Sequence, residues 1–385
     1  MKLRFLLIFA FYFTFLIAED DDSTSTFQYQ FKTLKEIPST TVKNQGKSGT
    51  CWSYATISFL ESEILRETGN EVDLSEMFIV RNTYANKAIK YIRLHGANTF
   101  AEGGQSHDVT DIMKTYGVVP QEVYNGFEID GKVDHKEISK VTKAFLDAVL
   151  DSRYLTSKWF EAFSGILDTY LGENPEKFEY NGKKYTPKSF MTDYLKIDPS
   201  DYVELTSYTN YPFYEKCCLE VPDNWSYDCN YYNLPIDELE AVIDNALEKG
   251  YSVCWDADVS DKFWTPDTFD YAILPTKAFE DTIEDKWDDK IKGQIEEKLV
   301  DQELRQETFD NFNTTDDHLM HLVGNAEDQF GNKYYKIKNS WGSKDKQFNG
   351  YYYVSQSYFR QQTICLMVHK DSVPKKIRKK FKNKM

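Results

Sequence analysis

The two halves of this 385-residue chain follow different hydrophobic patterns. In the N-terminal half, apolar residues recur every three to four positions, which is typical of helices that bury one face. This spacing predicts helices at 52–69, 74–95, 107–117 and 136–171. In the C-terminal half, short β-branched and aromatic runs lie between Gly, Asn and Asp. They predict strands at 251–256, 320–324, 333–338 and 350–354. A helix-rich half followed by a strand-rich half predicts an α+β fold of two lobes with a cleft between them.

Three shorter patterns add detail to this prediction. The Asn-Gly pair within 180–185 is typical of a tight hairpin. Residues 27–31 have the composition of a short extended segment. The charged stretch 279–312 predicts a helix that packs one apolar stripe and exposes its other face. That stripe consists of Trp287, Ile291, Ile295, Leu299 and Leu304.

Composition excludes several classes of protein. The chain contains 27 Tyr and 26 Phe, so it can bury a large core and is neither disordered nor fibrous. Its net charge of −16 disfavours nucleic-acid binding over the body of the protein. The tail 373–385 differs, because it holds seven Lys or Arg residues and no acid. Such a run is most simply a solvated end.

The first eighteen residues have the pattern of an export signal. Lys2 and Arg4 precede an apolar run, 5–18, which ends in a small residue before an acidic stretch. The run is shorter than the roughly 20 residues of a membrane-spanning helix. We therefore expect removal of 1–18 and an exported protein without a stable membrane anchor. It would be periplasmic or secreted, or follow a secretory or lysosome-like route in a eukaryote.

Six cysteines are too few for a disulfide scaffold in a chain of this length. Cys217 and Cys218 are adjacent and rarely bridge each other, because their Cα atoms are too close for relaxed geometry. Cys229 could pair with either of them, so the sequence leaves the pairing open. Cys254 and Cys365 have no assigned partner.

Cys51 is different, because it lies where a glycine-bearing loop meets the start of a predicted helix. A helix N-terminus lowers the pKa of a thiol, and the thiolate is the nucleophilic form. Such a nucleophile also needs a histidine base, a group that orients the imidazole, and donors for the oxyanion. Candidates for these three parts are His318, Asn339 and Gln45.

The order of these motifs resembles the papain-like cysteine peptidases. Gln45-Gly46 followed by Gly49 and Cys51-Trp52, then Asp317-His318 before an apolar run, then Asn339-Ser340-Trp341-Gly342 carry the resemblance. It covers roughly 38–375. Ser48 stands where papain has a disulfide cysteine, and 267 residues separate Cys51 from His318. Both features are typical of the bleomycin hydrolase/aminopeptidase C branch. Stretches such as Val221-Pro222-Asp223-Asn224-Trp225 are similar to its exported bacterial members.

The resemblance implies a two-lobed fold, a helical lobe and a β-barrel-like lobe, with a large helical insertion between the cysteine and the histidine. The implied domains are the peptidase, 19–372, with insertions at about 130–205 and 279–312, and the tail 373–385. No cofactor and no metal site are expected.

The resemblance also assigns roles to the site residues. Cys51 would be the nucleophile and His318 the general base and later the acid. Asn339 would orient the imidazole, and Trp341 would shield that hydrogen bond. Gln45 and the Cys51 backbone N–H would hold the oxyanion. The pair Gly103-Gly104 would align the substrate backbone.

Several residues compete with this assignment. His321 lies three positions after His318, so on a strand the two rings face opposite sides and only one can meet Cys51. The family pattern favours His318. The pair with Asp316 and Asp317 could suggest a metal site, but no matching third ligand is evident. We expect the remaining histidines at the surface or at helix caps: His95, His107, His135 and His369.

The predicted function is a cysteine peptidase that forms a thioester acyl-enzyme and trims N-terminal residues of peptides. One alternative is an endopeptidase with an open cleft. Another is a non-catalytic peptide-binding or nucleic-acid-associated relative. The expected partners are peptide substrates and no nucleic acid, and a homo-oligomer is left open.

Overall fold

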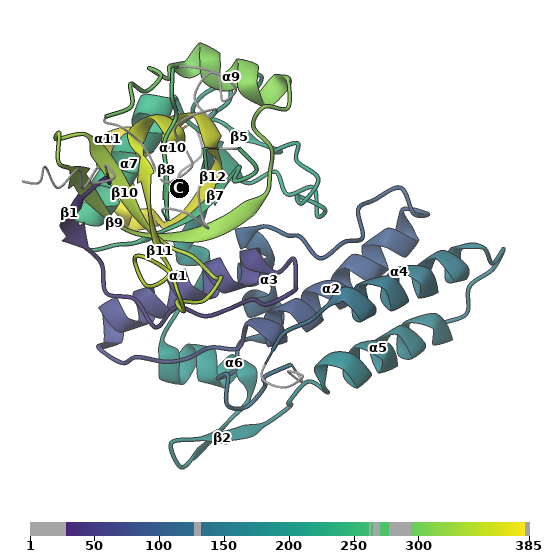
Figure 1. Ribbon diagram of the computed structural model, residues 1–385. Coiled ribbons are helices and arrows are strands. Elements are labelled where there is room, and N and C mark those ends of the chain that lie inside the picture. Colours follow the sequence, from purple (N-terminus) through teal and green to yellow (C-terminus); the bar gives the residue numbers. More distant parts are fainter. Residues whose placement is uncertain (1–27, 127–131, 262, 265–269, 277–293, 382–385) are drawn as a thin grey trace, which may run out of the picture.

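The computed structural model describes residues 28–126, 132–261, 263–264, 270–276 and 294–381 of the chain. Its elements form a helical lobe and a lobe built around a large sheet (Figure 1). The α+β class and the two-lobed papain-like arrangement expected from the sequence are confirmed. The division into domains and insertions by residue number stays a prediction.

The centre of the helical lobe is α1 (Cys51–Thr68). Every residue from Cys51 to Ile64 is buried, so this helix is covered on all sides rather than on one stripe. It ends at Gly69, whose φ of 71° is the left-handed conformation that commonly terminates helices. Helices α2 (Glu76–Arg93) and α3 (Ser106–Tyr116) pack against α1.

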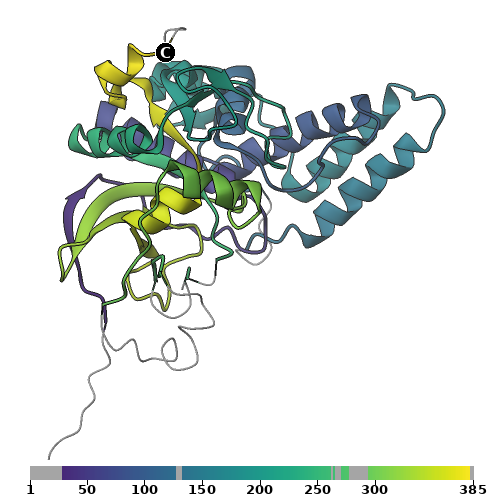
Figure 2. The ribbon, with the colours of Figure 1, turned by 90° about the horizontal axis from the view of Figure 1, so that it is seen from above.

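A helical extension projects from this lobe. Helices α4 (Lys136–Leu150) and α5 (Lys158–Leu171) pack on α2 and point away from the rest of the molecule (Figure 2). The sequence predicted one helical segment over 136–171, but the chain breaks at 151–157 so that the two helices run side by side. The hairpin of β2 (Phe178–Tyr180) and β3 (Lys183–Tyr185) turns at Asn181 and Gly182, as predicted. The short α6 (Pro187–Ser189) follows it.

The second lobe is a mixed sheet in the order β5-β6-β4-β12-β7-β9-β10-β11-β8, with β1 paired to β9. Its long central strand is β9 (His318–Asp328), which lies between β7 (Val253–Ala257) and β10 (Lys333–Lys338). The other strands are β1 (Phe31–Glu36), β4 (Tyr202–Thr206), β5 (Lys216–Cys217), β6 (Tyr231–Asn233), β8 (Tyr271–Ala272), β11 (Tyr351–Ser355) and β12 (Thr363–His369). The four predicted strand segments correspond to β7, β9, β10 and β11.

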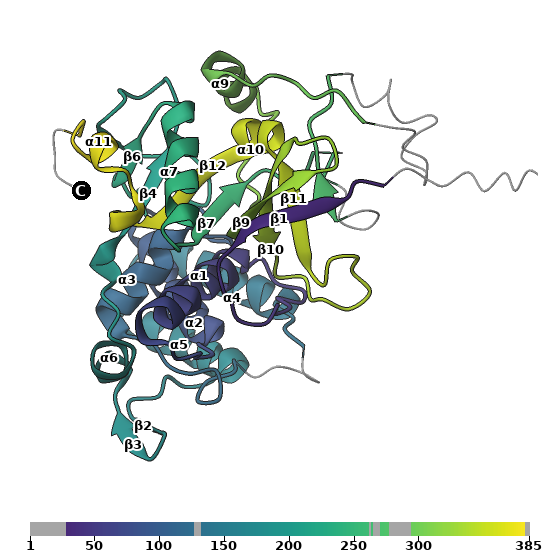
Figure 3. The same ribbon diagram turned by 90° about the vertical axis from the view of Figure 1, so that its left-hand side faces the viewer.

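Three helices cover this sheet: α7 (Ile236–Glu248), α10 (Gln356–Gln362) and α11 (Lys375–Arg378) (Figure 3). The basic tail is therefore partly folded. Ile377 and Phe381 are buried in the core of this lobe, and the Phe381 ring packs edge-on against Tyr232. Lys380 pairs with Glu238 on α7.

The prediction of one helix over 279–312 is wrong for the residues of that segment that the structure describes. Only α9 (Gln302–Asp310) is helical, whereas Glu297 forms a bridge with Pro275 and Leu299 is 95% exposed. Trp287 and Ile291 lie outside the described residues. The segment 5–18 of the predicted export signal lies outside them as well. Among the described residues, no helix has the length and apolar character to span a bilayer.

Candidate active site

Cys51 lies at the first position of α1, on the side of that helix that packs against β7 and β9. The backbone N–H of Leu319 donates a hydrogen bond toward its sulfur. Leu319 directly follows His318, so the first residues of β9 lie against the thiol. These two residues are 267 positions apart in the sequence, and only the packing of the two lobes joins them.

The hydrogen bonds of His318 fix which ring nitrogen carries the proton. His318 Nε2 lies 2.8 Å from Asn339 Oδ1, and the Ser340 backbone N–H donates to the same oxygen at 2.7 Å. Because a backbone N–H can only donate, that atom of Asn339 is an acceptor, and Nε2 must therefore donate to it. Nδ1 is then the unprotonated nitrogen, free to accept the thiol proton. The orienting role predicted for Asn339 agrees with this geometry.

Trp341 covers the imidazole. Its ring stacks on that of His318 with centroids 4.7 Å apart and planes inclined by 24°. Both His318 and Asn339 are buried, so water has little access to the bond between them. The low local dielectric strengthens that hydrogen bond.

Burial shifts both reacting groups toward their neutral forms. Desolvation raises the pKa of the Cys51 thiol to about 12, although the hydrogen bond from the Leu319 N–H lowers it in part. Desolvation lowers the pKa of His318 to about 4, although the hydrogen bond to Asn339 raises it in part. Either charge alone is costly here, whereas proton transfer from thiol to imidazole creates both charges together, and they attract each other.

Backbone hydrogen bonds between the loop 43–45 and the loop 340–342 hold Gln45 in place. Its backbone N–H donates to Ser340 O, and the Gly342 N–H donates to Lys43 O. Its side-chain Nε2 donates to Ser48 O at 2.7 Å, while Oε1 accepts from the Ser340 hydroxyl at 2.6 Å. The second hydrogen of Nε2 stays available, as does the Cys51 N–H in the unpaired first turn of α1. These are the two donors that an oxyanion needs.

The predicted substrate-aligning glycines lie next to this loop. Glu102, which precedes them, accepts from the Gly49 N–H through its carboxylate and from the Trp52 indole through its carbonyl. At Gly104, an added Cβ would stand 3.0 Å from the Trp52 ring, so only glycine fits without a shift. The Gly103 carbonyl accepts from the buried Lys87 ammonium. The segment is thus rigidly attached to the loop that carries Cys51.

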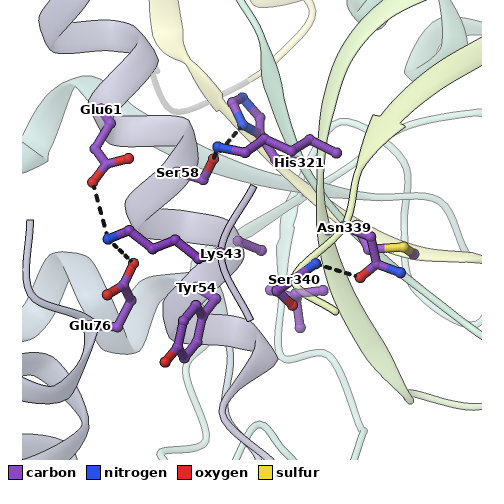
Figure 4. Close-up of a pocket in the computed structure, with 12 residues that line it drawn as sticks. Lys43, Tyr54, Ser58, Glu61, Glu76, His321, Asn339 and Ser340 are labelled. Atoms are coloured by element: carbon purple, nitrogen blue, oxygen red, sulfur yellow. Dashed lines mark hydrogen bonds and ion pairs between the residues drawn. The ribbon is translucent and has the colours of Figure 1, made fainter. Parts of the chain in front are cut away.

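The second histidine of β9 belongs to a different environment. His321 faces α1, where its Nδ1 lies 2.9 Å from the Ser58 hydroxyl (Figure 4). Around it lies a set of charges, buried except for the half-buried Lys43, that we call the paired-charge network; it consists of Lys43, Glu61, Glu76 and Lys338. Lys43 contacts both Glu61 and Glu76, and Lys338 donates to the hydroxyls of Thr40 and Ser58. This environment is typical of a structural histidine, and the choice of His318 as the base stays a prediction.

The other histidines were predicted at the surface or at helix caps, and this holds for three of them. His95 is exposed, and His135 and His369 are buried N-cap residues of α4 and of the short helix 370–372. The prediction is wrong for His107, which is buried inside α3. His107 pairs with Glu204 at 3.0 Å, and although desolvation opposes it, this carboxylate raises the pKa of the imidazole to about 10. With Asp228 these residues are the one group of potential metal ligands found within the described ranges. Both ring nitrogens of His107 already have partners, so a buried ion pair accounts for the group.

The sequence did not single out three carboxylates near Cys51. Asp256 on β7, Asp316 before β9 and Asp223 on the loop after β5 all act electrostatically on the thiol. The motifs that contain Asp223 and Asp316 were visible in the sequence. Their convergence was not, because they come from three separate segments. We call these three residues the acidic cluster.

Two lobes, a cysteine at a helix N-terminus and a histidine oriented by an asparagine define a papain-like cysteine peptidase. A family model described as the Peptidase C1-like family matches residues 78–385. The chain belongs to this family.

Known relatives agree with this assignment. Aminopeptidase G of Lactobacillus delbrueckii subsp. lactis is 25% identical over 396 residues, which cover 88% of this chain and 83% of that protein. Cysteine proteinase 1, mitochondrial, of Saccharomyces cerevisiae is 23% identical and covers 91% of this chain, with 79% of its own length aligned. The crystal structure of PepW from Lactobacillus rhamnosis has the same fold, with a TM-score of 0.69 at 20% identity over 91% of this chain and 84% of that one. The resemblance to the aminopeptidase C branch is confirmed.

Proposed function

We propose that the protein is a cysteine aminopeptidase that removes residues from the free N-terminus of peptides. The observation that carries this proposal is the Cys51–His318–Asn339 arrangement in a chain whose relatives include aminopeptidases G and C. The reaction needs no group beyond those described and a water molecule. His318 Nδ1 accepts the Cys51 proton, and the sulfur attacks the peptide carbonyl.

The two oxyanion donors, Gln45 and the Cys51 N–H, stabilise the charge that develops on the carbonyl oxygen. The protonated His318 then gives its proton to the leaving amine, and the thioester remains on Cys51. A water molecule, deprotonated by His318, hydrolyses the thioester and releases the amino acid.

A comparison of one peptide with its N-acetylated form tests this function. Purified protein should cleave the free peptide in single-residue steps and cleave the acetylated peptide far more slowly. C51A should be inactive with both and should keep the circular dichroism and melting behaviour of the parent. Equal cleavage of both peptides would instead establish an open-cleft endopeptidase, and no cleavage by folded protein would favour a peptide-binding relative.

The proposal includes export from the cytoplasm, with residues 1–18 as a cleaved signal. Its support is the basic start and apolar run of that segment. The Cys218–Cys229 disulfide adds to this, because such bonds persist mainly in oxidising compartments. N-terminal sequencing of protein recovered from the native host should find a start near Glu19. Recovery of the intact N-terminus from the cytoplasm would contradict this part.

A further inference from the structure

The loop between β5 and β6 holds Asp223 at the edge of the substrate-aligning segment. A Cβ built on Gly103 would stand 1.9 Å from Asp223 Oδ2, so this carboxylate occupies the space that a side chain at Gly103 would take. The loop is closed by the Cys218–Cys229 disulfide. The Trp225 indole N–H donates to Asp108 at the N-terminus of α3 and fixes the loop against the helical lobe.

Asp256 approaches the same place from the sheet. On β7 it pairs with Leu319 of β9 and with Cys365 of β12, so its side chain lies on the face that the sheet turns toward α1. It is 1% exposed. Asp316 joins it from the segment before β9 and accepts from Gln105 Nε2 at 3.0 Å. The three carboxylates therefore come from three segments and lie within electrostatic reach of one another and of the Cys51 thiol.

These carboxylates have acceptor atoms that the protein does not satisfy. Asp256 Oδ1 is fully buried and has no hydrogen-bond donor within the described part of the chain. The Asp256 carboxyl also forms a hydrogen bond with Asp316, which is possible only while one of the two carries a proton and is lost when both are ionised. Asp223 is half-buried, and no described residue donates a hydrogen bond to it. A buried carboxylate oxygen without a donor costs free energy, so such atoms indicate a ligand that supplies N–H groups.

The charge balance points the same way. Desolvation and the neighbouring carboxylates raise the pKa of Asp256 to about 7, and they raise the pKa of Asp316 and Asp223 as well. The Lys87 ammonium lowers the pKa of Asp223 in part, but it donates its hydrogen bonds to the carbonyls of Ala101 and Gly103. Without a ligand the cluster thus retains protons, whereas a cation with several N–H donors would replace them.

A peptide substrate of an aminopeptidase carries such a group. The residue that acylates Cys51 bears its ammonium on the carbon next to the reacting carbonyl, so this ammonium must lie close to the sulfur. We propose that Asp223, with Asp256 and Asp316, forms the subsite that binds the free α-ammonium group of the substrate, an inference that rests on the proposed function. The acidic cluster then selects peptides with a free N-terminus and excludes substrate peptides whose backbone continues past Gly103.

The described part of the C-terminal tail does not contribute to this subsite. From Lys375 to Phe381 it packs on the far part of the sheet lobe, with Phe381 on Tyr232 and Lys380 on Glu238. Loss of 374–385 would remove the buried Ile377 and Phe381 from the core. Removal of 382–385 alone avoids that damage, so this shorter truncation is the informative one.

The experiment measures kcat/KM of the full chain for one peptide in free and N-acetylated form. D223N keeps the shape of the side chain and removes its charge, and we expect the preference for the free peptide to fall by about 10- to 100-fold. Cleavage of the acetylated peptide should stay equal or rise. The matched control is E220Q, which removes an exposed carboxylate from the same disulfide-closed loop and should keep the parental preference. The truncation at 381 should keep it as well.

Binding measurements separate recognition from turnover. In the C51A background, calorimetry should show that D223N weakens binding of the free peptide and leaves the acetylated peptide unchanged. D256N serves as a second variant if D223N does not fold. An unchanged preference in both folded variants, or a preference lost on truncation at 381, would overturn the inference. Absence of any preference in the parent protein would instead overturn the proposed function.

Discussion

Two groups of largely buried ionisable side chains lie near the catalytic residues, and they differ in how their charges are balanced. In the paired-charge network, each carboxylate faces a lysine: Lys43 lies between Glu61 and Glu76, and Lys338 completes the set through Thr40 and Ser58 (Figure 4). The acidic cluster instead collects carboxylates to which no described cation donates a hydrogen bond, and only Asp223 feels the charge of Lys87. The first arrangement is complete as it stands, and the second becomes complete with a cationic ligand.

This difference teaches how to distinguish a structural cluster from a binding site. Burial alone does not, since both groups are largely removed from water and both contain carboxylates with raised pKa values. The distinguishing property is whether the protein itself supplies the opposite charge and the hydrogen-bond donors. Substitutions in the two regions should therefore change different quantities.

The largest expected effect concerns the two histidines of β9, which point to opposite sides. H318A removes the base beside Cys51 and should lower kcat/KM by about 10²- to 10⁴-fold with little change in melting temperature. H321A lies in the structural region and should change kcat/KM only a few-fold. The measurement is steady-state cleavage of a free peptide by both folded variants. A larger loss in H321A would show that the strand register has been assigned wrongly.

The next effect tests the paired-charge network. K43M leaves Glu61 and Glu76 buried without their nearest cation, and we expect it to destabilise the fold by about 3–5 kcal/mol. Denaturant unfolding followed by fluorescence measures this. R378M is a suitable control, because it removes a cation from the exposed pair with Asp371, which should contribute at most about 1 kcal/mol. Equal stability of K43M and the parent would show that the network is not structural.

In the acidic cluster, a substitution that removes a charge should stabilise the fold, whereas K43M should destabilise it. The folded-state pKa of Asp256 is raised from 3.8 to about 7, so the folded protein binds more protons than the unfolded chain between these values. Stability from this group is therefore lost as pH rises from about 4 to about 7. D256N should remove that loss and stabilise the free enzyme by about 1–2 kcal/mol at pH 8 while it weakens binding of free peptides.

Unfolding of the parent and D256N at pH 5 and pH 8 checks this prediction. The titratable neighbours of Asp256 are Asp223, Asp316, Cys51, Cys254, Cys365, Tyr208 and Tyr231. The pKa values of the cysteines and tyrosines among them are raised, and those of the two other carboxylates are raised as well. A difference between the proteins that shrinks toward pH 8 would contradict the prediction.

The smallest effect concerns how the two regions are held. The paired-charge network is fixed by α1, α2 and β10, whereas Asp223 depends on the loop closed by Cys218–Cys229. The double variant C218S/C229S should lower the preference for free over acetylated peptides by a few-fold, less than D223N. The double variant should cleave acetylated peptides, a reaction that depends on His318 and not on the acidic cluster, at nearly the parental rate. A preference as low as that of D223N would mean that the disulfide alone positions the carboxylate.

Much of the catalytic apparatus followed from local sequence. Cys51 comes directly after a glycine-bearing loop at a helix start, and Asn339-Ser340-Trp341-Gly342 is a compact motif, so residue type and order were sufficient for both. Their roles agree with the geometry, since Asn339 accepts from His318 and Trp341 stacks on it. The alternation of side chains along a strand also separated His318 from His321, because residues three positions apart face opposite sides.

The sequence by itself determined the α+β class and predicted the nucleophile, its base and the orienting amide, because these depend on periodicity and on short motifs. The tertiary structure decided the partner of Cys229, the break between α4 and α5, and the burial of the tail through Phe381. It also decided that Asp223, Asp256 and Asp316 meet beside Cys51. Each of these depends on distances between segments far apart in the chain, and no local pattern encodes such a distance. The acidic cluster arises from the register of β7 against β9 and β12 and from a loop docked on α3, which exist only once the lobes have packed.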